Sequence, residues 1–237
     1  MTEIKTNQKK ILFSDYDGTL SPLNIKGNIT AIKNFIDNNN TFVISTRRNS
    51  KSILHKINKY HIPVNFITCS NGSLTMDNTG KIVTAFEFNR KELTFLFHIL
   101  KANKHISDIK FVSKNGNVYR DIIPNNAMAI RCNCSLFYNL KEFIKPLPGY
   151  SCYRYGAGYE IKPSYINKSF AANELIRMLK ADKSFDYQSY SIGNTLNDYE
   201  LLKNHNGYVV GYGSLLLKKK INGKTTKSVA SLISKIS

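Results

Sequence analysis

Two aspartates separated by one residue follow the first apolar segment of the chain. Asp15 and Asp17 lie in the run from Asp15 to Leu20, whose sequence is DYDGTL. Two carboxylates at a strand end, or one carboxylate and one main-chain carbonyl, can hold a single hard cation such as Mg²⁺. With a cation to neutralise a phosphate, one aspartate can act as nucleophile and the other as general acid and then base. Such pairs are also common in turns, so the two carboxylates alone leave both interpretations open.

Further polar groups follow later apolar segments in the same way. They are Ser45-Thr46-Arg47 after residues 41–45, Ser70-Asn71-Gly72 after residues 64–68, and Gly193 to Asp198, with the sequence GNTLND, after residues 188–192. In an open α/β sheet, ligands bind outside the carboxyl ends of the strands. We therefore expect these turns at one edge of a sheet.

The hydrophobic pattern at both ends of the chain predicts alternating strands and helices. The expected strands are residues 10–14, 41–45, 64–68, 188–192 and 208–210, and the expected helices are residues 28–39, 50–60 and 168–180. Right-handed crossovers between successive strands make such strands parallel. The two ends of the chain thus predict an α/β core with a Rossmann-like parallel sheet.

The middle of the chain has a different sequence pattern, in which short aromatic segments typical of strands alternate with segments typical of helices. The expected strands there are residues 84–88, 110–112, 118–122, 127–132 and 158–163, and the expected helices are residues 92–101 and 137–144. This pattern predicts a separate α+β module over residues 81–162. It interrupts a core made of residues 1–80 and 163–237.

The net charge of +18 is spread along the chain and forms no basic arm. A positive field of this size attracts anionic ligands of any kind, including phosphorylated metabolites, and attracts nucleic acid without sequence specificity. The densest basic run, Lys218 to Lys220, suits a solvated helix face or turn better than a binding patch. We expect no specific nucleic-acid partner.

The sequence also predicts a cytoplasmic protein without a membrane partner. No apolar stretch approaches the roughly 20 residues that a bilayer span needs, and the polar, basic first residues lack the features of a signal peptide. The four cysteines lack the spacing of a zinc site, so we expect reduced thiols. The oligomeric state is left open.

Four of these segments together resemble a known family. DYDGTL resembles the first motif of the haloacid dehalogenase superfamily, whose most common members are phosphatases. Ser45-Thr46-Arg47 resembles the second motif, with Thr46 where glycine is usual, and Lys168 resembles the lysine of the third. Gly193 to Asp198 is similar to the acidic fourth motif, with Asn194 in place of its first aspartate. Four motifs in order at expected strand ends are specific.

The resemblance implies a role for each matching residue. Catalytic roles fall to Asp15 as nucleophile, Asp17 as acid and base, Ser45 and Lys168. Magnesium is expected at Asp15, Asp17, Asn194 and Asp198. Substrate contacts are expected from Thr46, Arg47, Asn71, Gly72 and Asn197. Arg48 is a second candidate beside Arg47, with one of the two arginines expected to be merely solvated.

The inserted module and the Ser70-Asn71-Gly72 turn resemble the type IIB subgroup, in which a larger α/β cap supplies substrate selection. That subgroup includes Cof-type, trehalose-phosphate and sucrose-phosphate phosphatases. The resemblance implies Mg²⁺-dependent hydrolysis of a small phosphate monoester, with a sugar or polyol phosphate favoured. Two alternatives stay open: a phosphomutase on the same scaffold, and a catalytically weakened member that acts as a binding or regulatory protein.

Overall fold

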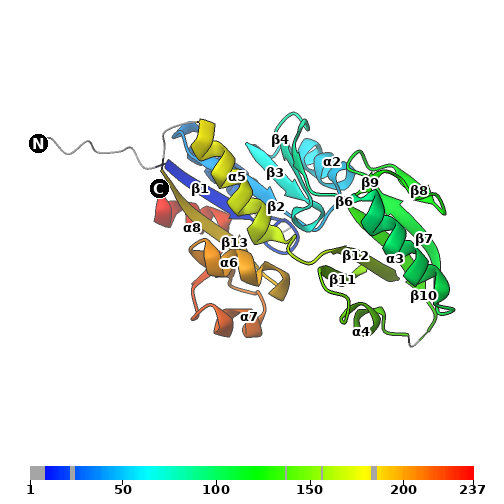
Figure 1. Ribbon diagram of the computed structural model, residues 1–237. Coiled ribbons are helices and arrows are strands. Elements are labelled where there is room, and N and C mark those ends of the chain that lie inside the picture. The colour runs from blue at the N-terminus through cyan, green and yellow to red at the C-terminus, as the bar shows by residue number, and fades with distance from the viewer. Residues whose placement is uncertain (1–8, 22–24, 137, 156, 183–185) are drawn as a thin grey trace, which may run out of the picture. The chain divides into compact units, whose positions relative to one another are not determined.

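The computed structural model describes residues 9–21, 25–136, 138–155, 157–182 and 186–237, and the chain forms two compact units (Figure 1). The first unit contains the described residues up to Thr84 and from Asn167 onward, and the second runs from Ala85 to Ile166. The boundaries expected from sequence, after residues 80 and 162, each lie four residues before these.

In the described residues of the first unit, eight strands form one sheet in the order β15-β14-β13-β1-β2-β3-β4-β5. The central strand β1 (Lys9–Ser14) pairs in parallel with β2 (Thr41–Ser45) on one side and β13 (Tyr187–Gly193) on the other. Parallel pairing continues outward through β3 (Phe66–Cys69), β14 (Gly207–Val210) and β15 (Thr225–Thr226). Strand β4 (Leu74–Asp77) is antiparallel to β3, and β5 (Ile82–Ala85) lies at the edge. The expected mostly parallel α/β core is confirmed.

Helices pack on this sheet through its alternating side chains. The helices are α1 (Ile25–Asp37), α2 (Ser50–Tyr60), α5 (Lys168–Asp182), α6 (Tyr199–Asn204), α7 (Leu215–Lys220) and α8 (Val229–Ile236). Ile11 and Phe13 of β1 pack against Ala172 and Leu175 of α5. Leu12 is equally buried and points to the opposite face, because successive side chains of a strand alternate. Burial on both faces explains why β1 reads as a continuous apolar run.

The second unit contains an antiparallel sheet of five described strands in the order β11-β12-β10-β7-β8. Its strands are β7 (Ile106–Val112), β8 (Val118–Arg120), β10 (Ala129–Cys134), β11 (Tyr150–Tyr155) and β12 (Gly158–Pro163). Helices α3 (Arg90–Ala102) and α4 (Leu140–Ile144) add leucine and isoleucine side chains to a core shared with this sheet. A reciprocal cap between Asn89 and Glu92 begins α3.

Several expected elements in the middle of the chain differ from the observed ones. The strand expected over residues 84–88 is interrupted, with β5 ending at Ala85 and β6 (Phe88–Asn89) pairing with β9 (Asn126–Ala127). Residues 127–132 are likewise split between β9 and β10. The start of the helix expected over residues 137–144 lies outside the described residues, and α4 begins at Leu140. An apolar run cannot show that its two halves belong to different sheets, so the splits were not predictable.

No helix among the described residues is both long enough and apolar enough to cross a bilayer.

Candidate active site

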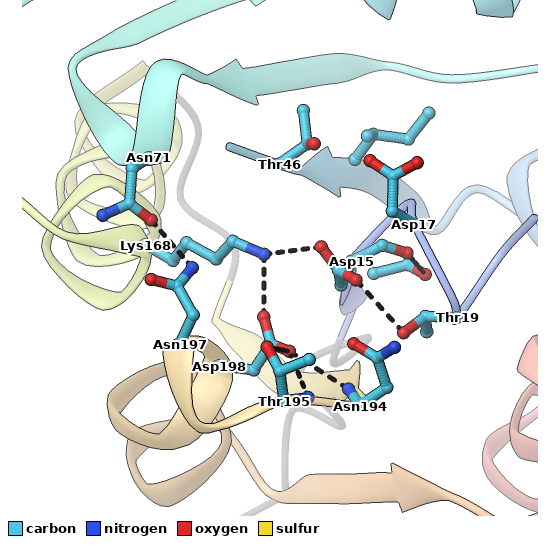
Figure 2. A network of polar contacts seen from close by, with 12 residues as sticks. Asp15, Asp17, Thr19, Thr46, Asn71, Lys168, Asn194, Thr195, Asn197 and Asp198 are labelled. Atoms are coloured by element: carbon cyan, nitrogen blue, oxygen red, sulfur yellow. Dashed lines mark hydrogen bonds and ion pairs between the residues drawn. The ribbon is translucent and has the colours of Figure 1, made fainter. Parts of the chain in front are cut away.

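Asp15 lies at the carboxyl end of β1 and is fixed by three contacts. Its backbone N–H donates to the carbonyl of Ile192 on the neighbouring strand β13 at 2.9 Å. Lys168 Nζ donates to Asp15 Oδ1 at 2.6 Å, and Thr19 Oγ1 donates to Asp15 Oδ2 at 3.2 Å (Figure 2). The carboxylate is therefore held from both sides in a buried position.

Lys168, at the start of α5, joins Asp15 to Asp198. Its ammonium also donates to Asp198 Oδ1 at 2.7 Å, and its side chain is only 2% exposed. This buried cluster contains two carboxylates and one ammonium, so it carries one excess negative charge when all three are ionised. An uncompensated buried charge is costly, and the cluster favours either a proton or an added cation.

The pKa values within the cluster follow from this charge balance. The pKa of Asp15 is raised to about 6, because burial and the neighbouring Asp198 raise it by more than Lys168 lowers it. Burial by itself lowers the pKa of Lys168, but Asp15 and Asp198 outweigh burial and raise it. Lys168 is thus a permanent cation beside a carboxylate that titrates near neutral pH.

Asp198 is occupied on its second oxygen as well. Oδ2 accepts hydrogen bonds from the backbone N–H groups of Asn194 and Thr195, each at 3.0 Å. These bonds fold the Gly193 to Asp198 turn around the carboxylate, and a Cβ at Gly193 would approach the Asp198 carboxyl carbon to 2.6 Å. Asp198 therefore anchors the turn and positions Lys168.

Asn194 lies against the turn that follows Asp15. A Cβ at Gly18, whose φ is +72°, would lie 2.1 Å from Asn194 Nδ2, so glycine is needed there for the amide to fit. Asn194 Oδ1 is buried and has no hydrogen-bond partner among the described atoms. A buried oxygen without a partner is rare, and a hydrogen-bond donor or a cation would satisfy it.

The donor set at this place fits Mg²⁺. The Asp15 carboxylate and the partnerless Oδ1 of Asn194 are hard oxygen ligands, and the cluster beside them has excess negative charge. The main-chain carbonyl of Asp17 would be a third oxygen of the same kind. No group of three or more His, Cys, Asp or Glu side chains in the described part of the chain has metal-holding geometry, so the amide and main-chain oxygens have to complete such a site.

Asp17 is turned toward Arg48. Its side chain is 53% exposed and accepts two hydrogen bonds from Arg48, from Nε at 2.8 Å and from Nη2 at 2.7 Å. Figure 2 shows the Asp17 carboxylate pointing away from the Asp15 and Lys168 pair. Arg47 is exposed. Of the two arginines, Arg48 is the one that contacts a candidate site residue.

A further hydroxyl near the site is that of Thr46 (Figure 2). Figure 2 shows Thr46 among the polar side chains that surround Asp15 and Asp17. Its backbone N–H donates to the carbonyl of Thr68 at 2.8 Å, and its Oγ1 accepts from the backbone N–H of Arg48 at 3.2 Å. Ser45 is fully buried at the end of β2, and its hydroxyl has no partner among the described atoms. Both hydroxyls are candidates for the phosphate contact expected of this segment.

Asn71 and Asn197 contact each other across 126 positions of sequence. Asn197 Nδ2 donates to Asn71 Oδ1 at 2.9 Å, which joins the turn after β3 to the turn after β13. Asn71 has a φ of +56°, and a Cβ at Gly72 would lie 2.3 Å from the carbonyl oxygen of Asn167, just before Lys168. Gly72 thus allows the close approach of the segment that presents Lys168.

The structure therefore brings Asp15, Lys168, Asn194 and Asp198 together. Thr19 makes a site contact that was not expected, and Arg48, the second candidate beside Arg47, pairs with Asp17. Thr19 lies four residues after Asp15, within the motif itself, so its position was a usable signal. The ion pair of Arg48 had no such signal, because the partner carboxylate lies 31 residues away.

Three comparisons relate the chain to known proteins. A family model described as haloacid dehalogenase-like hydrolase matches residues 12–147. No curated protein matches the chain. Many solved structures have a similar fold, and three of them, with sequence identities of 13–17%, illustrate the likeness.

BT1666 from Bacteroides thetaiotaomicron, described among phosphatases of the haloalkanoate (HAD) enzyme superfamily, has a TM-score of 0.74 and 17% identity over 100% of this chain and 97% of its own. TM0651 from Thermotoga maritima has a TM-score of 0.77 and 13% identity over 97% and 98% of the two chains. A haloacid dehalogenase-like hydrolase from B. subtilis has a TM-score of 0.73 and 15% identity over 96% and 100%. At these identities the solved structures support the fold class alone.

Proposed function

The chain belongs to the haloacid dehalogenase-like hydrolases, and from that premise we propose that it hydrolyses a small phosphate monoester with Asp15 as the nucleophile. The observation that carries the proposal is the position of the Asp15 carboxylate at the end of the central strand, between Lys168 and Thr19. A carboxylate fixed in this way can approach phosphorus in line with the leaving oxygen.

The residues around Asp15 suit a two-step displacement. An oxygen of Asp15 attacks phosphorus, the bond from phosphorus to the ester oxygen breaks, and Asp17 gives its proton to the leaving oxygen. Water then attacks phosphorus of the aspartyl phosphate while Asp17 takes its proton, and inorganic phosphate leaves. Lys168 and the hydroxyls of Ser45 and Thr46 would offset charge on the remaining phosphate oxygens.

Mg²⁺ is the cofactor that the oxygen donors suit. Asp15, Asn194 Oδ1 and the carbonyl of Asp17 would hold it, and when bound it would supply charge neutralisation for the phosphate. Asp198 contributes by orienting Lys168 and by closing the turn that carries Asn194.

Substrate selection is assigned to the second unit, which we propose as the cap. A sugar or polyol phosphate is the favoured substrate class, because the insertion between the second and third motifs resembles that of the type IIB subgroup in size and place. Arg47, Asn71, Gly72 and Asn197 are proposed as substrate contacts of the first unit.

A panel of phosphate esters, including trehalose, sucrose and hexose phosphates, tests the proposal with and without Mg²⁺. We expect turnover that needs Mg²⁺, none in Asp15→Asn, and a normal rate in Asp37→Asn, which makes the same change at an exposed site. Transfer of phosphate between positions of one sugar would indicate the phosphomutase instead. Turnover by Asp15→Asn near the wild-type rate would refute the nucleophile, and substrate binding without turnover would favour the weakened binding protein.

A further inference from the structure

The first unit has a cavity that the proposed reaction does not use. It has a volume of about 320 Å³ and lies between α6, the start of β14 and the turn that follows α7. Its polar lining includes Tyr199, Lys203, Asn206, Lys220, Asn222 and Lys224. None of these residues belongs to the candidate active site.

Two lysines approach the ring of one tyrosine in this cavity. Lys220 Nζ lies 4.9 Å from the ring centroid of Tyr199, and Lys203 Nζ lies 5.9 Å from it. An aromatic face attracts a cation, so Tyr199 gathers positive charge at the cavity wall. Lys224 adds a third ammonium to the lining.

The described lining of the cavity carries net positive charge. Among the described residues that line it there is no Asp or Glu, and none of the three lysines forms an ion pair with a described carboxylate. The three lysines are exposed, so water and salt screen their mutual repulsion, but a multivalent anion in this space would be attracted by all three.

The basic run from Lys218 to Lys220 is divided by the fold. Lys218 Nζ donates to the carbonyl oxygen of Gly211. Lys219 and Lys220 are both exposed, but Lys219 lies outside the cavity lining. Lys220 alone of the three lines the cavity. Lys219 thus lies on a solvated helix face, whereas Lys220 is a candidate binding group. The sequence pattern could not distinguish these two environments.

We propose that this cavity binds a small polyanion made of linked phosphate groups, such as the phosphate chain of triphosphate. The volume is sufficient for such a chain, and lysines suit phosphate because each acts as a compact point charge with three donors. A chain of linked phosphates places separate oxygens near several ammonium groups at once, which a single orthophosphate cannot do. The Tyr199 hydroxyl and the amide of Asn222 supply further polar groups at the wall.

Lysine acetylation read by mass spectrometry tests the site in the full chain. The reaction is run in metal-free buffer with EDTA, so that hydrolysis does not consume the ligand. We expect triphosphate to protect Lys203, Lys220 and Lys224 while Lys219 stays reactive. Orthophosphate at the same ionic strength should protect much less.

Affinity measurements by calorimetry use variants of equal charge change. We expect Lys220→Gln and Lys224→Gln each to weaken triphosphate binding about fivefold, which is typical of one lost charge pair near a surface. Lys219→Gln is the matched control and should bind as the wild type does, with circular dichroism confirming that all three variants fold.

Three results would overturn the proposal. Equal weakening in the Lys219, Lys220 and Lys224 variants would mean that the overall positive charge binds the anion. Equal protection by orthophosphate would remove the requirement for linked phosphates. Protection of the three lysines by an oligonucleotide but not by triphosphate would assign the surface to nucleic acid.

Discussion

Arg48 holds the Asp17 carboxylate at both oxygens, through Nη2 to Oδ1 at 2.7 Å and through Nε to Oδ2 at 2.8 Å. The same guanidinium donates from Nη1 to Ser52 Oγ on α2 at 2.9 Å and lies over the Tyr16 ring, 5.6 Å from its centroid. A bidentate pair of this kind fixes direction as well as distance. The orientation of Asp17 is thereby coupled to the first turn of α2.

This coupling predicts that Arg48→Gln impairs the acid step of hydrolysis. We expect the rate for alkyl phosphates to fall about tenfold, a fraction of what a general acid supplies. The rate for p-nitrophenyl phosphate should fall less, since that leaving group needs little protonation. Arg47→Gln removes the same charge at an exposed position and should keep both rates. Equal slowing of the two esters in Arg48→Gln would argue against a role through Asp17.

The amide of Asn194 predicts weak binding of Mg²⁺ at the site, which a carboxylate at this position would strengthen. Asn194→Asp adds a negative charge at the oxygen that has no partner, so half-maximal activity should need about tenfold less Mg²⁺. Turnover is measured as a function of magnesium concentration in the wild type and in Asn194→Asp. Asn38→Asp adds the same charge at an exposed site and is the control. An unchanged metal requirement in Asn194→Asp would show that Asn194 is not a ligand.

The pKa of Asp15 predicts how hydrolysis depends on pH. The nucleophile has to be ionised, and its pKa is raised to about 6, mainly by burial. The value of kcat/KM should therefore rise with pH through a midpoint of about 6 and level off at higher pH. Higher Mg²⁺ favours the carboxylate and should move this midpoint to lower pH. Rate profiles at two magnesium concentrations provide the measurement. If the midpoint does not change with the magnesium concentration, the group that titrates is not a ligand of the metal.

His205 predicts a loss of stability in acid. It is 3% exposed, and burial lowers its pKa from 6.5 to about 4. Between these two pH values His205 is therefore protonated in the unfolded chain and neutral in the folded protein. The contribution of His205 is present above pH 6.5 and is lost as pH falls toward 4, by up to about 3 kcal/mol.

Urea unfolding at several pH values measures this effect. His205→Gln should flatten the fall in the free energy of unfolding between pH 6.5 and 4, whereas His55→Gln at an exposed position should not. The difference between variants isolates His205 from Asp15, whose raised pKa acts with the opposite sign. If both histidine variants follow the wild-type curve, the imidazole of His205 does not control acid stability.

The sequence by itself determined the order of the core elements and the chemical character of each turn. Continuous apolar runs such as residues 41–45 mark strands that are buried on both faces, and this signal is local to the run. The DYDGTL segment after β1 carried both the family resemblance and the nucleophile candidate. Parallel strands then place their carboxyl ends at one edge, which is a general rule rather than a property of this chain.

The tertiary structure decided which side chains within those turns contact each other. Lys168 reaches Asp15 across 153 positions and Asn197 reaches Asn71 across 126, so neither pair leaves a trace in local spacing. The choice between Arg47 and Arg48 depends on which side chain turns toward Asp17, because neighbours in a tight turn point in different directions. Asp198, which is expected at the metal, accepts from Lys168 Nζ on one oxygen and from two backbone N–H groups of its own turn on the other. Such outcomes depend on how segments distant in sequence pack together, and residue type alone does not contain that information.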